Sequence, residues 1–428
     1  MPFAALGLAP CLVRAVSEQG YRVPTPIQAA AIPAILGTRD VWACAQTGSG
    51  KTAAFALPLL HHCLTVSPTQ PLPIRSLILV PTRELAAQIG EACRRYARYA
   101  PVPLKIVTVF GGVSINPQMM ALRGGADVVV ATPGRLLDLV ARNALSLRAV
   151  ASLVLDEADR LLDLGFDDEL THLLDLLPRE RQNLLFSATF PPSVQGLAER
   201  LLHDPLRFEV PAITPQPTIQ QRAIQVDAAR RTQLLRHLFE THQWARALVF
   251  VATQYTTQHV AEKLRRAGLN AAPFHGELSQ SARTTTLADF KAQKLQVVVA
   301  TDVAARGLDI VQLPVVVNYD LPRSAVDYLH RIGRTGRAGA PGLAVSFISA
   351  ENAAHFSLIE KRHTLKLPRE IIEGFEPTVA ATPTSPVRSE GGVKGRRKSK
   401  KDKLREAAEQ SANAPSGFAW PPWVPPSS

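Results

Sequence analysis

Short runs of aliphatic and β-branched residues alternate with longer stretches of helical periodicity through most of the chain. Strands that alternate with helices indicate βαβ units and a parallel sheet with helices on both faces. Runs such as Asp127-Val128-Val129-Val130 fit strands that are buried on both sides. The pattern predicts strands at Ser76–Val80, Ile106–Phe110, Ala126–Ala131, Ser152–Leu155, Asn183–Phe186, Ala247–Val251, Gln296–Ala300, Val315–Asn318 and Leu343–Ile348.

A proline-rich break near Asp204–Thr218 divides this pattern into two parts. It contains Pro205, Pro211, Pro215 and Pro217, and proline restricts both its own φ and the residue before it. We therefore read the break as an extended linker. A chain of 428 residues has room for two or three domains. The predicted organisation is an α/β domain at 1–208, a linker at 209–218, a second α/β domain at 219–375 and a tail at 376–428.

The tail differs in composition from the rest of the chain. It is rich in Pro, Ser and Gly, and such a segment buries too little apolar surface to become ordered. Between Lys394 and Arg405 it has eight basic residues and one acid, within a chain of net charge +12. This run predicts either a nucleic-acid-binding tail or a solubilising terminus, and charge alone favours neither. Trp420-Pro421-Pro422-Trp423 suits either base stacking or a partner protein.

Cysteine usage and hydropathy indicate a cytoplasmic protein with no membrane association. The four cysteines form no CxxC pair and have no His cluster beside them, which disfavours a zinc site. Four thiols in a chain of this length also disfavour a disulfide framework and fit a reducing compartment. No apolar run approaches the length of a bilayer span. The stretch Met1 to Val13 lacks a cationic start, so we read it as an amphipathic segment rather than a signal peptide.

A glycine-rich loop follows the apolar run Val41–Cys44 and precedes a helical stretch at Ala53–Leu60. In this strand–loop–helix context, backbone N–H groups and the helix N-terminus bind phosphate. Lys51 suits the β and γ phosphates, and the Thr52 hydroxyl suits Mg²⁺. A tight strand-to-helix turn alone would not require a buried lysine, so we predict nucleotide binding. The loop residues are Ala45, Gln46, Thr47, Gly48, Ser49, Gly50, Lys51 and Thr52.

A second motif, which is acidic, follows the predicted strand at Ser152–Leu155. Asp156-Glu157-Ala158-Asp159 would reach the carboxyl end of the sheet, where ligands bind in such folds. Phosphoryl transfer needs a metal ligand and a group that orients water. Asp156 suits the first role, partly through water, and Glu157 the second. An acidic helix N-terminus stabilised by the helix dipole would be the better interpretation if no phosphate loop were present.

These motifs together resemble the DEAD-box RNA helicases, and the remaining motifs of that family follow in order over residues 3–348. The likeness is greatest to the bacterial RhlE-type branch. It implies two tandem RecA-like domains, ATP and Mg²⁺ as cofactors, RNA as partner, and sequence-tolerant binding. The implied activity is RNA-stimulated ATP hydrolysis coupled to local, non-processive unwinding of short duplexes or remodelling of ribonucleoproteins. Ribosome assembly, RNA decay and cold adaptation remain open as settings.

The resemblance also implies roles at the nucleotide. Gln28 would pair with adenine and Tyr21 would stack on it, near Phe3; an alternative is a proline-rich turn that caps a helix. Arg334 and Arg337 would be arginine fingers, because the run His330–Arg337 would be costly to assemble without an anion. The other implied nucleotide ligands are Gly307 and Asp309. The residues implied to couple the ATP and RNA sites are Asp159, Ser187, Thr189 and His330.

The resemblance implies RNA-backbone contacts in both domains, each after a predicted strand. Threonine, arginine and backbone amides bind phosphate without reading sequence. Taken singly, each motif could be an ordinary turn. In the first domain the residues are Pro81, Thr82, Arg83, Gly111, Gly112, Thr132, Pro133, Gly134 and Arg135. In the second they are Thr253, Gly276, Arg283 and Thr301.

We expect an active site that is complete only when the two domains close. ATP and RNA would then each favour the closed state and tighten each other's binding. Two other functions remain possible from the sequence. One is a DNA-directed helicase of the same superfamily, and the other is an ATP-independent RNA chaperone or scaffold that acts through the basic tail.

Overall fold

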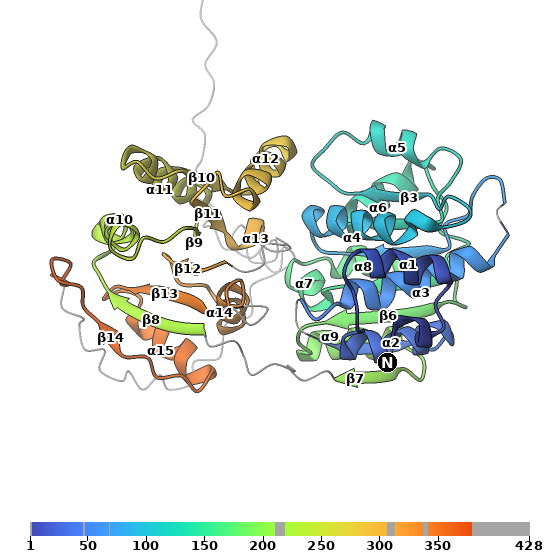
Figure 1. Cartoon of the computed structure of the whole chain (residues 1–428), viewed down its shortest axis with the longest axis horizontal. Coiled ribbons are helices and arrows are strands. Elements are labelled where there is room, and N and C mark those ends of the chain that lie inside the picture. Colours follow the sequence, from blue (N-terminus) through green and yellow to red (C-terminus); the bar gives the residue numbers. More distant parts are fainter. Residues whose placement is uncertain are drawn as a thin grey trace, which may run out of the picture. The chain divides into compact units, whose positions relative to one another are not determined.

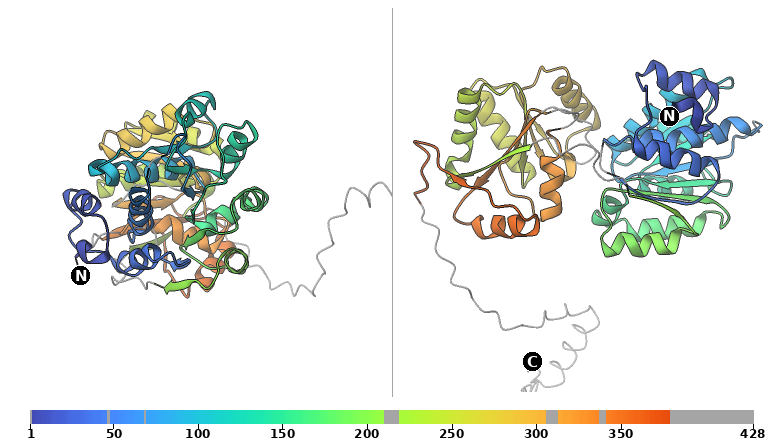
Figure 2. Two further views of the ribbon diagram at one scale, coloured as in Figure 1. Left: turned by 90° about the vertical axis from the view of Figure 1, so that its right-hand side faces the viewer. Right: turned by 60° about the horizontal axis from the view of Figure 1, so that its bottom comes forward.

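A computed structural model describes residues 2–45, 48–67, 69–209, 219–305, 313–336 and 341–378. Within these ranges the chain forms two parallel sheets of seven strands each (Figure 1). We call residues 2–209 the first lobe and residues 219–378 the second lobe. In both, helices cover the two faces of the sheet (Figure 2). This arrangement is the predicted α/β architecture of tandem RecA-like domains.

The first lobe has the strand order β3-β4-β2-β5-β6-β1-β7. Nearly every residue of its central strands is buried, because helices cover both faces, and this accounts for their continuous apolar sequences. Parallel pairing brings the carboxyl ends of all these strands to one edge. The strands are β1 Val41–Cys44, β2 Ser76–Leu79, β3 Ile106–Val109, β4 Val128–Ala131, β5 Ser152–Leu155, β6 Gln182–Ser187 and β7 Leu206–Glu209.

Two apolar cores separate the helices of the first lobe by face. One core joins the sheet to the first four helices, and the other joins it to the helices that follow β3. The first four are α1 Pro10–Glu18, α2 Pro26–Leu36, α3 Lys51–Thr65 and α4 Arg83–Tyr96. The others are α5 Asn116–Leu122, α6 Pro133–Ala141, α7 Ala158–Asp163, α8 Asp167–Leu176 and α9 Pro192–Leu201. Short 3₁₀ turns lie at Phe3–Leu6 and Ala97–Tyr99.

The second lobe repeats this plan with the order β10-β11-β9-β12-β13-β8-β14. Its first two helices pack on one face of the sheet, and the later ones on the other. The strands are β8 Ile219–Gln225, β9 Ala247–Val251, β10 Ala271–Phe274, β11 Val297–Thr301, β12 Val315–Asn318, β13 Gly342–Ile348 and β14 Arg369–Glu370. The helices are α10 Arg231–His242, α11 Gln254–Arg266, α12 Gln280–Lys291, α13 Asp302–Ala305, α14 Ala325–Ile332 and α15 Ala353–Arg362, with a 3₁₀ turn at Ala228–Arg230.

The structure corrects one part of the linker prediction. Leu206–Glu209, inside the proline-rich break, is strand β7, paired in parallel with β1 at the edge of the first sheet. Pro205 precedes the strand and so disturbs none of its pairing. Residues 210–218 of the predicted linker at 209–218 and the tail beyond residue 378 lie outside the described residues, so the proposed domain boundaries stay predictions. Among the helices of the described ranges, none has the length and apolar character of a membrane span.

Candidate nucleotide and nucleic-acid site

The sheet order of the first lobe sorts the predicted site residues into two neighbouring groups. Strands β5, β6 and β1 are adjacent and lead into the acidic motif, Ser187 and the phosphate loop. Strands β3, β4 and β2 form the other half of the sheet and lead into the three predicted RNA-contact stretches. Because parallel strands end at one edge, nucleotide chemistry and nucleic-acid binding would share that edge without sharing residues.

The phosphate loop leads directly into helix α3, which begins at Lys51. Lys51 is buried, and its ammonium group donates to the Ala45 carbonyl oxygen at 2.8 Å. Gly50 has φ +93°, and a Cβ on it would lie 2.4 Å from Nε2 of Gln28. Only glycine suits this position, since both the backbone angle and the space exclude a side chain. The Ser49 hydroxyl is buried with no hydrogen-bond partner among the described residues, so it is free to bind a ligand oxygen.

The two acids stand at the end of β5 and immediately before α7. Asp156 accepts a hydrogen bond from the Glu157 N–H at 3.0 Å, and Glu157 has φ +52°, a left-handed conformation that is uncommon outside glycine. Burial raises the pKa of Asp156 to about 6, and the positive charge of Lys51 opposes this rise. Glu157 is also buried and pairs with Arg160 at 3.1 Å. The two acids therefore do stand at a helix N-terminus, and their catalytic roles stay predictions.

The donor set at this edge suits Mg²⁺. Magnesium prefers oxygen ligands, keeps several waters and takes only one or two protein carboxylates. Thr52 and the buried Asp156 supply a hydroxyl and one such carboxylate, and a divalent cation would offset the cost of ionising Asp156. Within the described ranges, no group of three or more His, Cys, Asp or Glu side chains is arranged to hold a metal by itself.

Asp159 joins the acidic motif to the segment after β6. Its Oδ2 accepts from the Thr189 N–H at 3.0 Å and from the Thr189 hydroxyl at 2.8 Å. The Asp159 N–H donates to Ser187 Oγ at 3.2 Å, and that hydroxyl donates to the Thr189 carbonyl at 2.7 Å. These three residues therefore form the hydrogen-bonded link that the resemblance implies, whereas their coupling role stays a prediction.

The residues predicted to read adenine adjoin the phosphate loop. Gln28 Oε1 accepts from the Thr25 N–H at 2.9 Å, so the helix-capping interpretation is also correct, and its Nε2 donates to the Gly50 carbonyl at 3.1 Å. Tyr21 is 38% exposed, and its ring stacks on Phe3 with centroids 6.4 Å apart. Gln28 is thus tied to the loop, while Tyr21 keeps a ring surface for a ligand.

The predicted RNA-contact stretches of the first lobe contact one another. Thr82 caps α4, where its hydroxyl accepts from the Leu85 N–H at 3.3 Å. A Cβ on Gly112 would lie 2.0 Å from Nη1 of Arg83, so the Arg83 guanidinium lies directly on this glycine. Arg135 donates to the Val113 carbonyl at 2.9 Å. Its Nε and Nη1 are buried without hydrogen-bond partners among the described residues, and Nε lies 3.7 Å from the Asp138 carboxylate. Of the remaining residues, Pro81, Gly111 and Thr132 lie in the three loops, and Pro133 and Gly134 begin helix α6.

The second lobe positions its candidates in the same way. Thr253, Gly276 and Thr301 follow or end β9, β10 and β11, which are adjacent strands. Thr253 caps α11 by accepting from the Thr256 N–H at 3.1 Å. Arg283 forms an ion pair with Glu84 of α4 at 2.7 Å, and both side chains are 6% exposed. This pair gives Arg283 a partner within the chain, and its predicted RNA contact stays untested.

One cation of the run 330–337 does not need the nucleotide as its anion, which corrects part of the prediction. Arg331 is buried and already has an anion: it donates to both carboxylate oxygens of Asp302, at 2.5 and 2.6 Å. It also donates to Oδ1 of Asn318 at 3.1 Å. Arg331 is therefore part of the second lobe's core. Arg334 is buried as well and lines a small cavity with His330, Phe250 and Arg160.

His330 lies in an environment that disfavours its charged form. Burial lowers the pKa of His330 to about 4, and the positive charge of Arg160 adds to this effect. The imidazole is therefore neutral at physiological pH and can both donate and accept a hydrogen bond. Gln46, Thr47, Gly307, Asp309 and Arg337, which were predicted to bind the nucleotide, lie outside the described residues.

Sequence reasoning missed two side chains of this site. Arg160 was not singled out, although it lies three residues after Glu157 on one helical turn and pairs with it. That spacing of opposite charges could have predicted the contact. Asp302 was not singled out either, because no local signal pairs it with Arg331, which is 29 residues away.

The fold and the loop together define a class: a two-lobed P-loop nucleotide-binding protein with RecA-like sheets. Sequence comparison narrows this class. The DEAD/DEAH box helicase family matches residues 25–197, and the helicase conserved C-terminal domain matches residues 230–339. The chain is 42% identical to the ATP-dependent RNA helicase DbpA of Escherichia coli over 361 residues, covering 84% of this chain and 78% of DbpA. The chain belongs to the DEAD-box helicase family.

Two further similarities qualify this result. The chain is 44% identical to the ATP-dependent RNA helicase DeaD of Mycobacterium tuberculosis, over 85% of this chain but only 64% of that protein's length. The structure resembles Saccharomyces cerevisiae Dbp5 bound to RNA and ADP BeF3, with a TM-score of 0.76 and 31% identity, over 86% of this chain and 95% of that one. The more specific assignment to the RhlE-type branch stays a prediction.

Proposed function

We propose that this protein is an ATP-dependent RNA helicase, which hydrolyses ATP in response to RNA and separates short duplexes locally. The observation that carries the proposal is that Asp156, Ser187 and the phosphate loop lie at the ends of three adjacent strands, with Lys51 of the loop close enough for its charge to act on Asp156. A buried lysine and a buried carboxylate at a phosphate loop suit a nucleotide and Mg²⁺. The neighbouring loops after β2, β3 and β4 offer donors suited to RNA phosphates.

In this proposal the nucleotide is held mainly by the first lobe. Lys51 and the amides of the phosphate loop bind the phosphates, and Gln28 and Tyr21 bind adenine. Mg²⁺, held by Thr52 and Asp156, would neutralise charge on the phosphates. Glu157 orients the attacking water, and its contact with Arg160 fixes the direction of the carboxylate. Arg334 and Arg337 supply positive charge to the transferring phosphoryl group from the second lobe.

RNA binding is coupled to this chemistry by closure of the two lobes. The Asp159–Ser187–Thr189 hydrogen bonds transmit the state of the acidic motif to the segment after β6. Arg283 pairs with Glu84 of the first lobe, and the positive charge of Arg160 helps to keep His330 neutral. Each ligand that favours the closed state should tighten binding of the other by the same factor.

The direct test is ATP hydrolysis by the full chain with single-stranded RNA, with DNA of the same sequence and without nucleic acid. We expect strong stimulation by RNA only, together with ATP-dependent separation of a short RNA duplex. Stimulation by DNA would favour a DNA-directed helicase. Duplex separation without ATP would favour a chaperone that acts through the basic tail. Lys51→Ala serves as the inactive control, because it removes the phosphate-binding ammonium group.

We further propose a cytoplasmic location and RNA-containing assemblies, such as ribosomal or RNA-decay complexes, as partners. Cys11, Cys44, Cys63 and Cys93 are all free thiols, and Cys63 and Cys93 are buried. Free thiols suit a reducing compartment. Fractionation of cells, followed by sequencing of RNA crosslinked to the protein, tests both parts of this proposal.

A further inference from the structure

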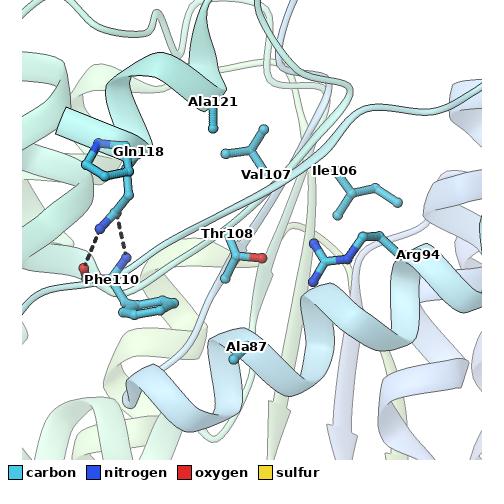
Figure 3. A pocket seen from close by; sticks show the side chains of 9 residues that line it. Ala87, Arg94, Ile106, Val107, Thr108, Phe110, Gln118 and Ala121 are labelled. Atoms are coloured by element: carbon cyan, nitrogen blue, oxygen red, sulfur yellow. Dashed lines mark hydrogen bonds between the residues drawn. The ribbon is translucent and has the colours of Figure 1, made fainter. Parts of the chain in front are cut away.

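A groove lies at the outer edge of the first lobe's sheet, between α4 and α5 (Figure 3). Strand β3 is the edge strand, and the two helices flank it from opposite faces of the sheet. The groove has a volume of about 360 Å³, within the range of roughly 300–1,000 Å³ that is usual for ligand pockets. Ala87 and Arg94 line it from α4, Pro117 and Gln118 from α5, and Ile106 and Thr108 from the strand.

The backbone of β3 has one side without a strand partner. The carbonyls of Lys105 and Val109 accept from β4 and the residue after it, so odd-numbered residues face the sheet. Successive residues point their backbone groups to opposite sides, which turns Ile106 and Thr108 outward. No hydrogen bond from another described residue reaches the N–H or C=O of these two. Such an edge is a template for an added strand.

The side-chain amide of Gln118 already forms strand-like hydrogen bonds with this edge at one position. Its Oε1 accepts from the Phe110 N–H at 3.0 Å, and its Nε2 donates to the Phe110 carbonyl at 3.0 Å (Figure 3). Phe110 is the next outward-facing residue after Thr108. The Gln118 amide thus occupies the place of a neighbouring strand at this one position. It closes the edge at Phe110 and leaves it open at Ile106 and Thr108.

The other groups in the groove suit a polar, anionic ligand segment. Arg94 extends from α4 toward the strand beside Ile106 (Figure 3). Lys105, whose ammonium group donates to the Arg123 carbonyl, adds one further cation where β3 begins. Against these two positive charges, Glu91 pairs with Arg94 at 3.2 Å in an exposed contact.

We propose that this groove binds an extended polypeptide segment of a protein partner, which adds as a strand to β3 and places an acidic side chain beside Arg94. Backbone hydrogen bonds to Ile106 and Thr108 would supply affinity, and the cations would select for acid. RNA offers no backbone N–H donors to match the outward carbonyls. This proposal is independent of the helicase activity, because none of the groove's residues has a part in the proposed ATP or RNA sites.

The test uses a displayed library of random linear peptides, selected on the full wild-type chain. Thr108→Pro removes the outward N–H without removing any bond to β4, and proline is tolerated at such edge positions. Arg94→Glu reverses the charge in the groove. Arg95→Glu is the matched control, because it makes the same charge change on the adjacent, exposed residue of α4, outside the groove. Unchanged thermal midpoints and ATPase rates establish that each variant is folded.

We expect the selected peptides to be acidic and rich in β-branched residues. They should slow hydrogen exchange at the Ile106 and Thr108 amides, bind Thr108→Pro and Arg94→Glu about tenfold more weakly, and bind Arg95→Glu as wild type does. The proposal is overturned if no such peptide is enriched, or if the enriched peptides bind both groove variants normally. It is also overturned if Arg94→Glu weakens only the binding of an RNA oligonucleotide, since the groove would then belong to the nucleic-acid path.

Discussion

The Asp159 carboxylate accepts two hydrogen bonds from Thr189, from its backbone N–H at 3.0 Å and from its hydroxyl at 2.8 Å. Asp159 belongs to the motif that we assign to ATP hydrolysis, whereas Thr189 follows the central strand β6. The contact therefore ties the nucleotide side of the sheet to a segment without a proposed chemical role. Loss of this contact should affect coupling more than it affects chemistry.

Thr189→Val removes the hydroxyl bond and keeps the side chain's shape. A hydrogen bond to a charged group contributes about 1.5–3 kcal/mol, so separation of a short RNA duplex should fall about tenfold or more. RNA-stimulated ATP hydrolysis should stay within about threefold of wild type, because no proposed phosphate ligand changes. Thr171→Val, on the exposed side of α8, is the control. Equal loss of both activities would indicate a catalytic or purely structural role.

Glu157→Gln should nearly abolish ATP turnover while the protein still binds ATP and RNA. The amide keeps the size of the side chain but loses the negative charge that orients water and pairs with Arg160. Turnover, together with RNA retention in the presence of ATP, is the measurement, and exposed Glu199→Gln is the control. Unchanged hydrolysis would refute the assigned role of Glu157.

Arg331 lies in α14 and Arg334 just after it, and substitutions of the two should have different effects. Arg334→Ala should lower turnover on the order of 10³-fold, as loss of an arginine finger does, with ATP affinity largely kept. The exposed Arg266→Ala is its control. If Arg334→Ala loses less than about tenfold in turnover, the finger assignment is wrong.

Arg331→Met should instead destabilise the second lobe by roughly 3 kcal/mol, because it leaves Asp302 without its partner. Urea unfolding measures this difference. The double change with Asp302→Asn should recover much of the loss, since neither charge then remains unpaired. No recovery would mean that the ion pair is not the source of the effect.

The pKa of His330, lowered to about 4, predicts a pH-dependent stability. Between its ordinary value and 4, the unfolded chain binds a proton at this residue and the folded chain does not. The free energy of unfolding is therefore undiminished by His330 at neutral pH and declines as the pH falls through this window. For wild type relative to His330→Gln, the loss in unfolding free energy should be roughly 1–2 kcal/mol between pH 7 and pH 5. Identical pH profiles for the two proteins would contradict this environment.

Deletion of the basic tail from Glu390 onward should weaken RNA binding and flatten its dependence on salt. Binding with fewer phosphate contacts releases fewer counterions from the RNA. The slope of log affinity against log salt should therefore become shallower by about one per lost contact. Hydrolysis at saturating RNA should be retained, because the proposed catalytic residues lie elsewhere. RNA affinity that is unchanged at low salt would assign the tail another role.

The sequence predicted the regular parts of this molecule well, for reasons that are local. Buried parallel strands such as Val128–Ala131 need continuous apolar residues, and a phosphate loop needs glycine at Gly50, where no Cβ fits. Contacts between distant residues left no such signal. The pairing of Arg331 with Asp302 is one example, and the bond from Gln118 to the Phe110 backbone is another. Strand β7 was missed because Pro205 and Pro211 flank it, and such closely spaced prolines are typical of a linker.

A high-resolution structure of the full chain with RNA, Mg²⁺ and a non-hydrolysable ATP analogue is the most direct measurement of the proposed two-lobe site. With the lobes closed, the Arg334 guanidinium should lie within hydrogen-bonding distance of the γ-phosphate bound by Lys51. A closed complex in which Arg334 turns away from the phosphates would contradict the proposed mechanism.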